Sequence, residues 1–156
     1  MNLIIPLKKY SSLNIFFSEI IKNKTHEDNS FIKLLYSNNE FILNTLFLNL
    51  SLFTITTEKY FNNKTIIFDM NVNSNIISEL INIENDILKK VNINNKIPTY
   101  KLKQQIESGI LKFYDQNNTF GTNNNNENII IKISGIWANS IEYGIKYKFL
   151  LYNNLL

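Results

Sequence analysis

Alternating hydrophobic and polar residues predict a pair of β-strands near the start of the chain, at residues 31–36 and 41–53. The polar residues 37–40 separate the two strands, as the turn of a β-hairpin does. Successive side chains of a strand point to opposite faces, so one set on each strand is predicted to face the core. This set is Ile32, Leu34, Tyr36, Ile42, Leu46, Leu48, Leu50 and Leu52. Residues 65–70 predict a third strand.

The hydrophobic period becomes helical at residues 76–91. Hydrophobic residues there recur three or four positions apart, which is typical of a helix with one face on the core. They are Ile76, Ile77, Leu80, Ile83, Ile87, Leu88 and Val91. The polar residues 94–96 and then Pro98 are predicted to end this helix. A short helix is expected at residues 100–107 and a further strand at residues 110–114.

The end of the chain predicts a second hairpin, with residues 129–137 against residues 143–152. An asparagine-rich loop at residues 115–128 precedes it and is expected to be mobile. Strand alternation predicts one core face on this hairpin, and Trp137 falls on that face. The predicted core residues are Ile129, Ile131, Ile133, Trp137, Tyr143, Ile145, Tyr147 and Phe149. The opposite face carries Lys132, Lys146 and Lys148.

The order of these elements, three strands, a helix and three strands, predicts the fold class. We expect a β-rich α+β protein with an OB-like antiparallel barrel, in which one helix is inserted between the third or fourth strand and the C-terminal strands. A plain α+β sandwich is the alternative. A length of 156 residues fits one domain, so residues 1–156 are expected to form a single OB-like binding domain.

The composition argues against a catalytic centre. The chain has no cysteine and a single histidine, His26, so thiolate and multi-histidine metal sites cannot form. His26 lies in a charged stretch that is predicted to be an exposed loop. Glu84 and Asp86 are two positions apart on the predicted helix and do not share a face, and four glycines provide no phosphate-binding loop. We therefore expect no enzyme, no cofactor and no metal; a small-ligand enzyme on a β-barrel is the weakest hypothesis.

Lysines and aromatic residues are the remaining candidate chemistry. All 16 positive charges are lysines, the net charge is +3, and 13% of residues are aromatic. The lysine and asparagine preference indicates an AT-rich genome. Single-stranded nucleic acid is bound by aromatic rings that stack on bases and by cations that follow the backbone. The candidate residues are Phe31, Lys33, Phe41 and Phe47 on the first hairpin and Lys132, Lys146, Lys148 and Tyr152 on the second. The same pattern is also typical of the solvated face of a sheet.

Two stretches of the C-terminal half carry a resemblance to known proteins. Residues 131–137 (Ile-Lys-Ile-Ser-Gly-Ile-Trp) and 143–149 (Tyr-Gly-Ile-Lys-Tyr-Lys-Phe), with residues 105–113 upstream, resemble the ends of short proteins of nucleocytoplasmic large DNA viruses. Some of these are regarded as OB-fold single-stranded-DNA-binding proteins, similar to replication proteins of short-tailed phages. The resemblance implies a non-catalytic role in viral DNA replication, recombination or repair. It does not extend to the acidic tail of the phage proteins, because no acidic residue follows Glu142.

The same observations set the expected partners and compartment. The hydrophobic run at residues 3–5 is too short for a signal peptide, and no stretch approaches the roughly 20 apolar residues of a membrane span. We expect an intracellular protein, in the host cytoplasm (virus factory) or nucleus, with no membrane partner. The expected partner is single-stranded nucleic acid, DNA by the resemblance, together with a second copy of the chain or replication proteins. The alternative is a viral structural or protein-interaction module with no nucleic-acid binding.

Overall fold

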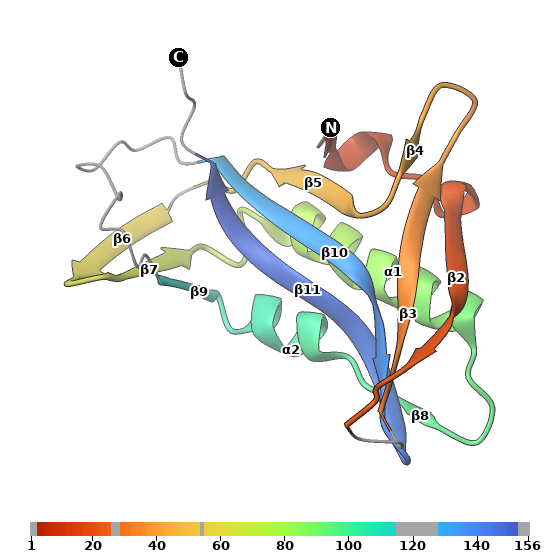
Figure 1. Cartoon of the computed structure of the whole chain (residues 1–156). Coiled ribbons are helices and arrows are strands. Elements are labelled where there is room, and N and C mark those ends of the chain that lie inside the picture. The colour runs from red at the N-terminus through yellow and green to blue at the C-terminus, as the bar shows by residue number, and fades with distance from the viewer. Residues whose placement is uncertain (1–2, 26–28, 54, 115–127, 153–156) are drawn as a thin grey trace.

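A large curled sheet is the main feature of the computed structural model, which describes residues 3–25, 29–53, 55–114 and 128–152 (Figure 1). Eight strands form this sheet: β1 (Ile4–Pro6), β2 (Ile15–Lys22), β3 (Ser30–Ser37), β4 (Ile42–Leu43), β5 (Leu46–Leu50), β8 (Ile97–Pro98), β10 (Asn128–Ala138) and β11 (Glu142–Tyr152). The long β10–β11 hairpin lies at its centre. One edge of β10 pairs with β11, and its other edge pairs first with β5 and then with β3. The predicted second hairpin is therefore confirmed.

A second, three-stranded antiparallel sheet lies at one end of the molecule. It contains β6 (Ile55–Tyr60), β7 (Asn63–Phe68) and β9 (Ile110–Tyr114) in that order. In Figure 1 it lies to the left of the β10–β11 hairpin. The strands predicted at residues 65–70 and 110–114 correspond to β7 and β9.

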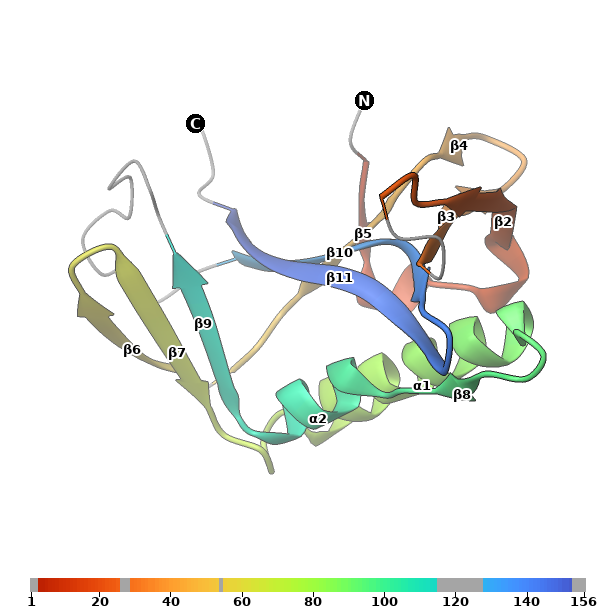
Figure 2. The same ribbon diagram turned by 60° about the horizontal axis from the view of Figure 1, so that its bottom comes forward.

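Two α-helices, α1 (Ser74–Val91) and α2 (Lys101–Glu107), lie along one face of the large sheet (Figure 2). The short 3-10 helices η1 (Leu7–Lys9) and η2 (Ser12–Asn14) precede β2. The helix predicted at residues 76–91 is present as α1, and its buried side chains keep the predicted spacing: Ile77, Leu80, Ile83, Ile87 and Leu88. Asn92, with a φ of 33°, ends this helix in the left-handed conformation that asparagine tolerates.

The core lies between the helices and the sheet face that we call the inner face. The predicted strand alternation is confirmed on three strands by the burial of Ile32, Leu34, Tyr36, Leu46, Leu48, Leu50, Ile129, Ile131 and Ile133. The prediction for Ile42 is wrong, because Ile42 is 72% exposed and Leu43 is buried in its place. Asn44 and Thr45 interrupt the predicted strand 41–53 and shift its alternation. Only β4 pairs with β3 in a hairpin, whereas β5 pairs with β1 and β10.

The sequence pattern missed β1, β2, β6 and β8. In β2 a register irregularity between Phe17 and Ile20 breaks the alternation that would identify a strand. The molecule is a strand-rich α+β protein with two α-helices in its described ranges. None of the helices in these ranges is long and apolar enough to span a membrane. His26 and all of the predicted loop 115–128 except Asn128 lie outside the described residues, and Asn128 is the first residue of β10.

Candidate nucleic-acid interface

The outer face of the large sheet, opposite the inner face, gathers most of the predicted site residues. Directly paired residues of an antiparallel ladder point to the same face. Lys132 on β10 pairs with Lys148 on β11 and, across its other edge, with Phe47 on β5. Further along β10, Gly135 pairs with Lys146 and Lys33. The last row of this face places Trp137 between Phe31 and Gly144.

Six of the eight predicted residues therefore share one face: Phe31, Lys33, Phe47, Lys132, Lys146 and Lys148. Lys146 and Lys148 are exposed, and the other four are partly exposed. Within β3, β5, β10 and β11 the one acidic residue is Glu142, at the start of β11. The outer face therefore carries a net positive charge.

The other two predicted residues, Phe41 and Tyr152, are not among the described side chains of the outer face. Phe41 stacks on Tyr36, with ring centroids 6.5 Å apart, and Tyr36 is buried in the core. The predicted outward face of Phe41 is wrong, because Asn44 and Thr45 shift the alternation so that Phe41 and Leu43 lie on the core side. The side chain of Tyr152 lies outside the described residues.

Trp137 belongs to the outer face, although strand alternation predicted it in the core. The pairing of β10 with β11 shifts register between Ile133 and Gly135, so Ser134 is an extra residue on β10. A β-bulge of this kind reverses the alternation beyond it. Ile136 is consequently buried and Trp137 is turned outward. The sequence signal was Gly135, since an isolated glycine within a strand pattern often marks a bulge.

The two glycines of the central hairpin let aromatic rings lie on the sheet. A Cβ atom at Gly135 would lie 2.6 Å from Cζ of Phe31, and one at Gly144 would lie 2.9 Å from Cζ2 of Trp137. Such distances are below van der Waals contact, so neither ring could keep its place over a residue with a side chain. Each ring therefore rests against the backbone of the neighbouring strand. Phe31 and Trp137 together form the aromatic platform of the outer face.

Each of three aromatic rings on this side has a lysine ammonium within the range of a cation–π interaction, about 6 Å. Nζ of Lys146 is 5.7 Å from the centroid of the Phe31 ring, and Nζ of Lys132 is 5.7 Å from that of Phe47. Nζ of Lys101, from the first turn of α2, is 4.5 Å from the Trp137 ring. Lys101 was not among the predicted site residues, because its position depends on the packing of α2 beside β11.

A cavity of about 790 Å³ opens at the end of the outer face where the paired ends of β2, β3 and β10 meet. The residues around it include Lys22, Lys24, Phe31, Trp137, Asn139 and Lys146. The sequence pattern missed Lys22 and Lys24, because no strand was predicted in this region. The cavity thus continues the aromatic and basic chemistry of the outer face.

The inner face holds β11 in place beneath the exposed lysines. Tyr147, between Lys146 and Lys148, donates a hydrogen bond from its hydroxyl to Oε1 of Gln105 on α2, at 2.7 Å. Burial raises the pKa of Tyr147 to about 12, and the nearby Glu84 carboxylate adds to this rise. The hydroxyl therefore keeps its proton at neutral pH. This contact ties β11 to α2.

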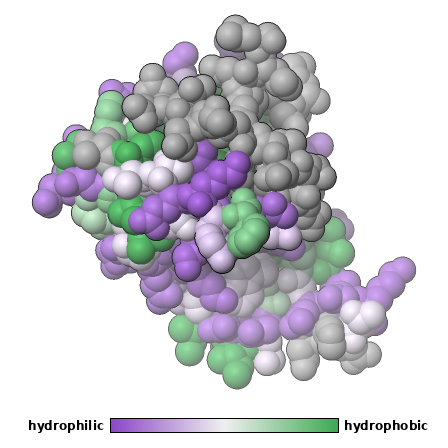
Figure 3. All heavy atoms as spheres, turned by 90° about the vertical axis from the view of Figure 1, so that its left-hand side faces the viewer, coloured by the Kyte–Doolittle hydropathy of each residue, from purple (hydrophilic) through white to green (hydrophobic). Residues whose placement is uncertain are grey.

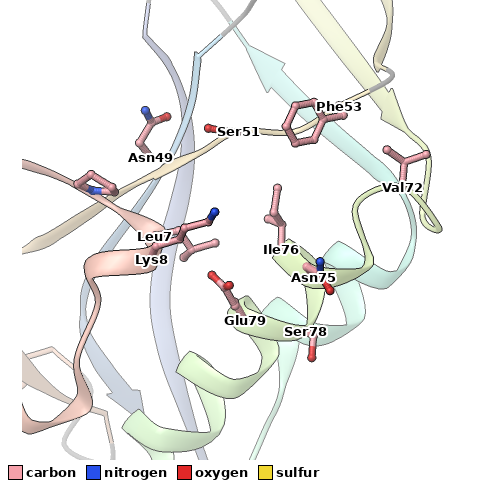
Figure 4. Close-up of a pocket in the computed structure, with 11 residues that line it drawn as sticks. Leu7, Lys8, Asn49, Ser51, Phe53, Val72, Asn75, Ile76, Ser78 and Glu79 are labelled. Carbon is pink, nitrogen blue, oxygen red and sulfur yellow. The ribbon is translucent and has the colours of Figure 1, made fainter.

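A second cavity, of about 630 Å³, lies between η1, the end of β5 and the start of α1 (Figure 4). Figure 4 shows the side chains of Lys8, Phe53, Ile76 and Glu79 around it. One lysine and one glutamate line it, so its charge is balanced. It lacks the combination of several cations and paired aromatic rings found at the outer face.

No family model, curated protein or solved structure matches this chain. What the outer face binds is therefore inferred from its own chemistry. That chemistry is two kinds of group side by side: aromatic rings on a sheet face and lysine ammonium groups near them. A ligand that contacts both kinds of group would need exposed aromatic faces and negative charge.

Proposed function

We propose that this protein binds single-stranded nucleic acid, specifically DNA, along the outer face of its large sheet, without catalysing a reaction. The observation that carries the proposal is the set of three aromatic rings, Phe31, Phe47 and Trp137, each with a lysine ammonium within 6 Å. The bases of an unpaired strand stack on such rings, and each stacked base contributes about 1–3 kcal/mol. The lysines neutralise phosphates of the same strand.

The spacing of these groups suits an extended strand. Lys132 and Trp137 pair with Lys148 and Gly144 on β11, which are four positions apart, so the two rows are separated by roughly 13 Å at the usual rise of a β-strand. The Phe47 row and the Phe31–Trp137 row would then contact different nucleotides. In a duplex the faces of the bases are covered by neighbouring base pairs, so the aromatic rings could not stack on them. We therefore expect single strands to bind more tightly than duplexes.

The finer assignments rest on the arrangement of the large sheet and on the sequence resemblance. A curled sheet with a long helix against its inner face supports an OB-like barrel. The resemblance of residues 131–137 and 143–149 to proteins of large DNA viruses supports DNA over RNA. It also supports a role in viral DNA replication, recombination or repair. Replication proteins or a second copy of the chain would be further partners, in the host cytoplasm or nucleus.

A viral structural or protein-interaction module is the second candidate function. It is favoured by exposed hydrophobic side chains away from the outer-face lysines, chiefly Tyr60 (74% exposed), Phe61 (77%) and Tyr114 (65%) on the small sheet. Figure 3 views the molecule from this side, where hydrophobic residues are interspersed with hydrophilic ones among the described residues. Protein interfaces more often centre on a continuous hydrophobic patch. The lysine-covered platform therefore carries the main proposal.

Fluorescence anisotropy with oligo-dT, oligo-rU and the matching duplex tests the proposed function. Wild-type protein should bind oligo-dT more tightly than the duplex, and log K should fall linearly with log salt, by about 0.7 per phosphate neutralised. The triple variant Lys132→Ala, Lys146→Ala, Lys148→Ala should bind more weakly, and its slope should be flatter by about 2. Substitutions of exposed lysines usually change folding stability by less than about 0.5 kcal/mol, so this variant should fold.

A matched control variant distinguishes the effect of the outer-face lysines from the effect of the overall charge of the protein. The variant Lys8→Ala, Lys9→Ala, Lys89→Ala removes the same number of exposed lysines from η1 and α1. It should retain the affinity and slope of the wild type. Equal weakening in the two triple variants, or no binding of oligo-dT by the wild type, contradicts the proposal. No binding would favour the structural or protein-interaction function.

A further inference from the structure

The cavity at the end of the outer face combines two aromatic rings with three lysines. Phe31 and Trp137 are direct partners in the β3–β10 ladder, so both rings point to the same face beside the cavity. Lys146 comes from β11, and Lys22 and Lys24 come from the end of β2 and the residues just after it. Its volume, about 790 Å³, falls within the range of roughly 300–1,000 Å³ typical of small-ligand pockets.

The composition of this cavity restricts what it could bind. No acidic residue is among the described residues around it. A purely hydrophobic ligand would leave three ammonium groups without a counter-charge, and a bare anion would make no use of two aromatic rings. A nucleotide satisfies both sets, because its base is a planar aromatic ring and its phosphate is an anion. Phosphate recognition by lysine and base recognition by aromatic stacking are both common in proteins.

The rest of the outer face offers a nucleotide fewer aromatic rings and lysines in one place. The row of Phe47, Lys132 and Lys148 has one ring and two lysines on an open surface. At the cavity, residues of β2, β3, β10 and β11 line one hollow, so a ligand there could contact more groups at once than on the open row. Binding free energy should therefore be concentrated at this end of the sheet.

We infer that this cavity holds one nucleotide, with its base against the rings of Phe31 and Trp137 and its phosphate beside Lys22 and Lys24. The inference rests on the proposed function, in which that nucleotide is part of the bound strand and anchors it at one end of the sheet. A free nucleotide has the same chemistry. The protein should therefore bind a mononucleotide by itself, which an open stacking surface does poorly.

Trp137 is the only tryptophan of the chain, so its fluorescence reports on the cavity directly. Full-length protein is titrated with thymidine 5′-monophosphate, thymidine, inorganic phosphate and oligo-dT. The monophosphate and oligo-dT should quench Trp137 emission in a saturable way. Thymidine should require at least about tenfold more ligand, because it lacks the charge-assisted phosphate contacts. Inorganic phosphate should leave the emission unchanged, because it does not stack.

A pair of matched variants locates the binding. In the double variant Lys22→Ala, Lys24→Ala, the thymidine monophosphate concentration that gives half of the Trp137 quenching should rise at least about fivefold. This is the loss of affinity expected when charge-assisted contacts are removed. Lys132→Ala with Lys148→Ala should leave that concentration unchanged while weakening oligo-dT in the anisotropy assay. These four lysines are at least partly exposed, so neither pair should unfold the protein.

The two assays separate failure of this inference from failure of the proposed function. If oligo-dT binds by anisotropy while the monophosphate leaves Trp137 emission unchanged, the nucleotide cavity is wrong and strand binding stands. If the monophosphate binds equally well to both lysine variants, it binds elsewhere and the inference is also wrong. If the monophosphate binds as expected while oligo-dT does not bind, the cavity is a site for free nucleotides and the proposed function is wrong.

Discussion

Oε2 of Glu84, on α1, accepts a hydrogen bond from the backbone N–H of Lys103 at the start of α2, at 2.8 Å. Oε1 of the same carboxylate accepts a second bond from the backbone N–H of Leu102, at 3.0 Å. The N-cap residue of α2, Tyr100, provides no capping side chain of its own. A buried residue of one helix therefore caps the other, and this places α2 against β11 beneath the exposed lysines.

Removing this cap should destabilise the fold. Glu84→Ala leaves two N–H groups near the core without acceptors, at a cost of about 2–4 kcal/mol in the free energy of unfolding. Glu84→Gln keeps one acceptor oxygen but turns an NH2 group toward the other N–H, so its cost should be intermediate. Urea unfolding followed by circular dichroism measures both variants. Equal stabilities of wild type and Glu84→Ala would show that the α1–α2 junction does not depend on this carboxylate.

The same carboxylate should make stability depend on pH. Burial raises the pKa of Glu84 above its ordinary value, although the N–H donors of Lys103 and Leu102 lower it in part. A carboxyl whose folded-state pKa is raised stabilises the fold fully below its unfolded pKa, and this contribution is lost as pH rises through the folded-state value. As the pH rises above about 4, the ordinary pKa of an unfolded glutamate, wild type should therefore lose stability relative to Glu84→Gln. A relative gain of stability with rising pH would contradict the direction of the shift.

The two glycines of the central hairpin should respond differently to alanine. A Cβ atom at Gly135 would collide with the backbone oxygen of Ile32 as well as with the Phe31 ring, and backbone cannot move aside easily. Gly135→Ala should cost more than about 2 kcal/mol. At Gly144 the close atoms belong to the side chains of Trp137 and Thr99, so Gly144→Ala should cost less than Gly135→Ala while shifting Trp137 emission. The opposite order of stabilities would contradict this account of the platform.

Phe47 should contribute to binding through stacking alone. Phe47→Ala should weaken oligo-dT binding by about 1–3 kcal/mol and leave the salt slope unchanged, because stacking releases no counterions. Phe47→Leu is the control for lost hydrophobic surface: it retains most of the bulk and lacks the ring. Anisotropy at two salt concentrations measures both variants. A flattened slope, or equal binding by wild type and the two variants, would exclude stacking on Phe47.

Local patterns in the sequence determine the parts of this structure that are regular over many residues. The helical spacing of α1 and the alternation of β10 and β11 were sufficient to predict these three elements and to place Lys132, Lys146 and Lys148 on one face. Where one residue interrupts the regularity, the prediction failed. Ser134 reversed the expected side of Trp137, and Asn44 with Thr45 shifted the strand that contains Ile42.

Other features depend on contacts that no local pattern contains. The pairing of β5 with β1 and β10 rather than with β3 depends on competition between strands for the same partner. Lys101 reaches Trp137 because α2 packs beside β11. The buried role of Glu84 depends on the position of α2 in the same way, since the helical pattern alone marks it as one polar residue among several.

The central position of β10 has a consequence for how the protein folds. Gly135 pairs with Lys33, roughly 100 residues earlier in the chain, and Ile131 pairs with Leu48 over a similar separation. Contacts this far apart in sequence slow folding, because a long loop must close before they form. During synthesis the edges of β3 and β5 that pair with β10 stay without hydrogen-bond partners from β10 until β10 emerges from the ribosome. In the finished protein β10 is paired on both edges, so its amide hydrogens should be among the last to exchange with solvent.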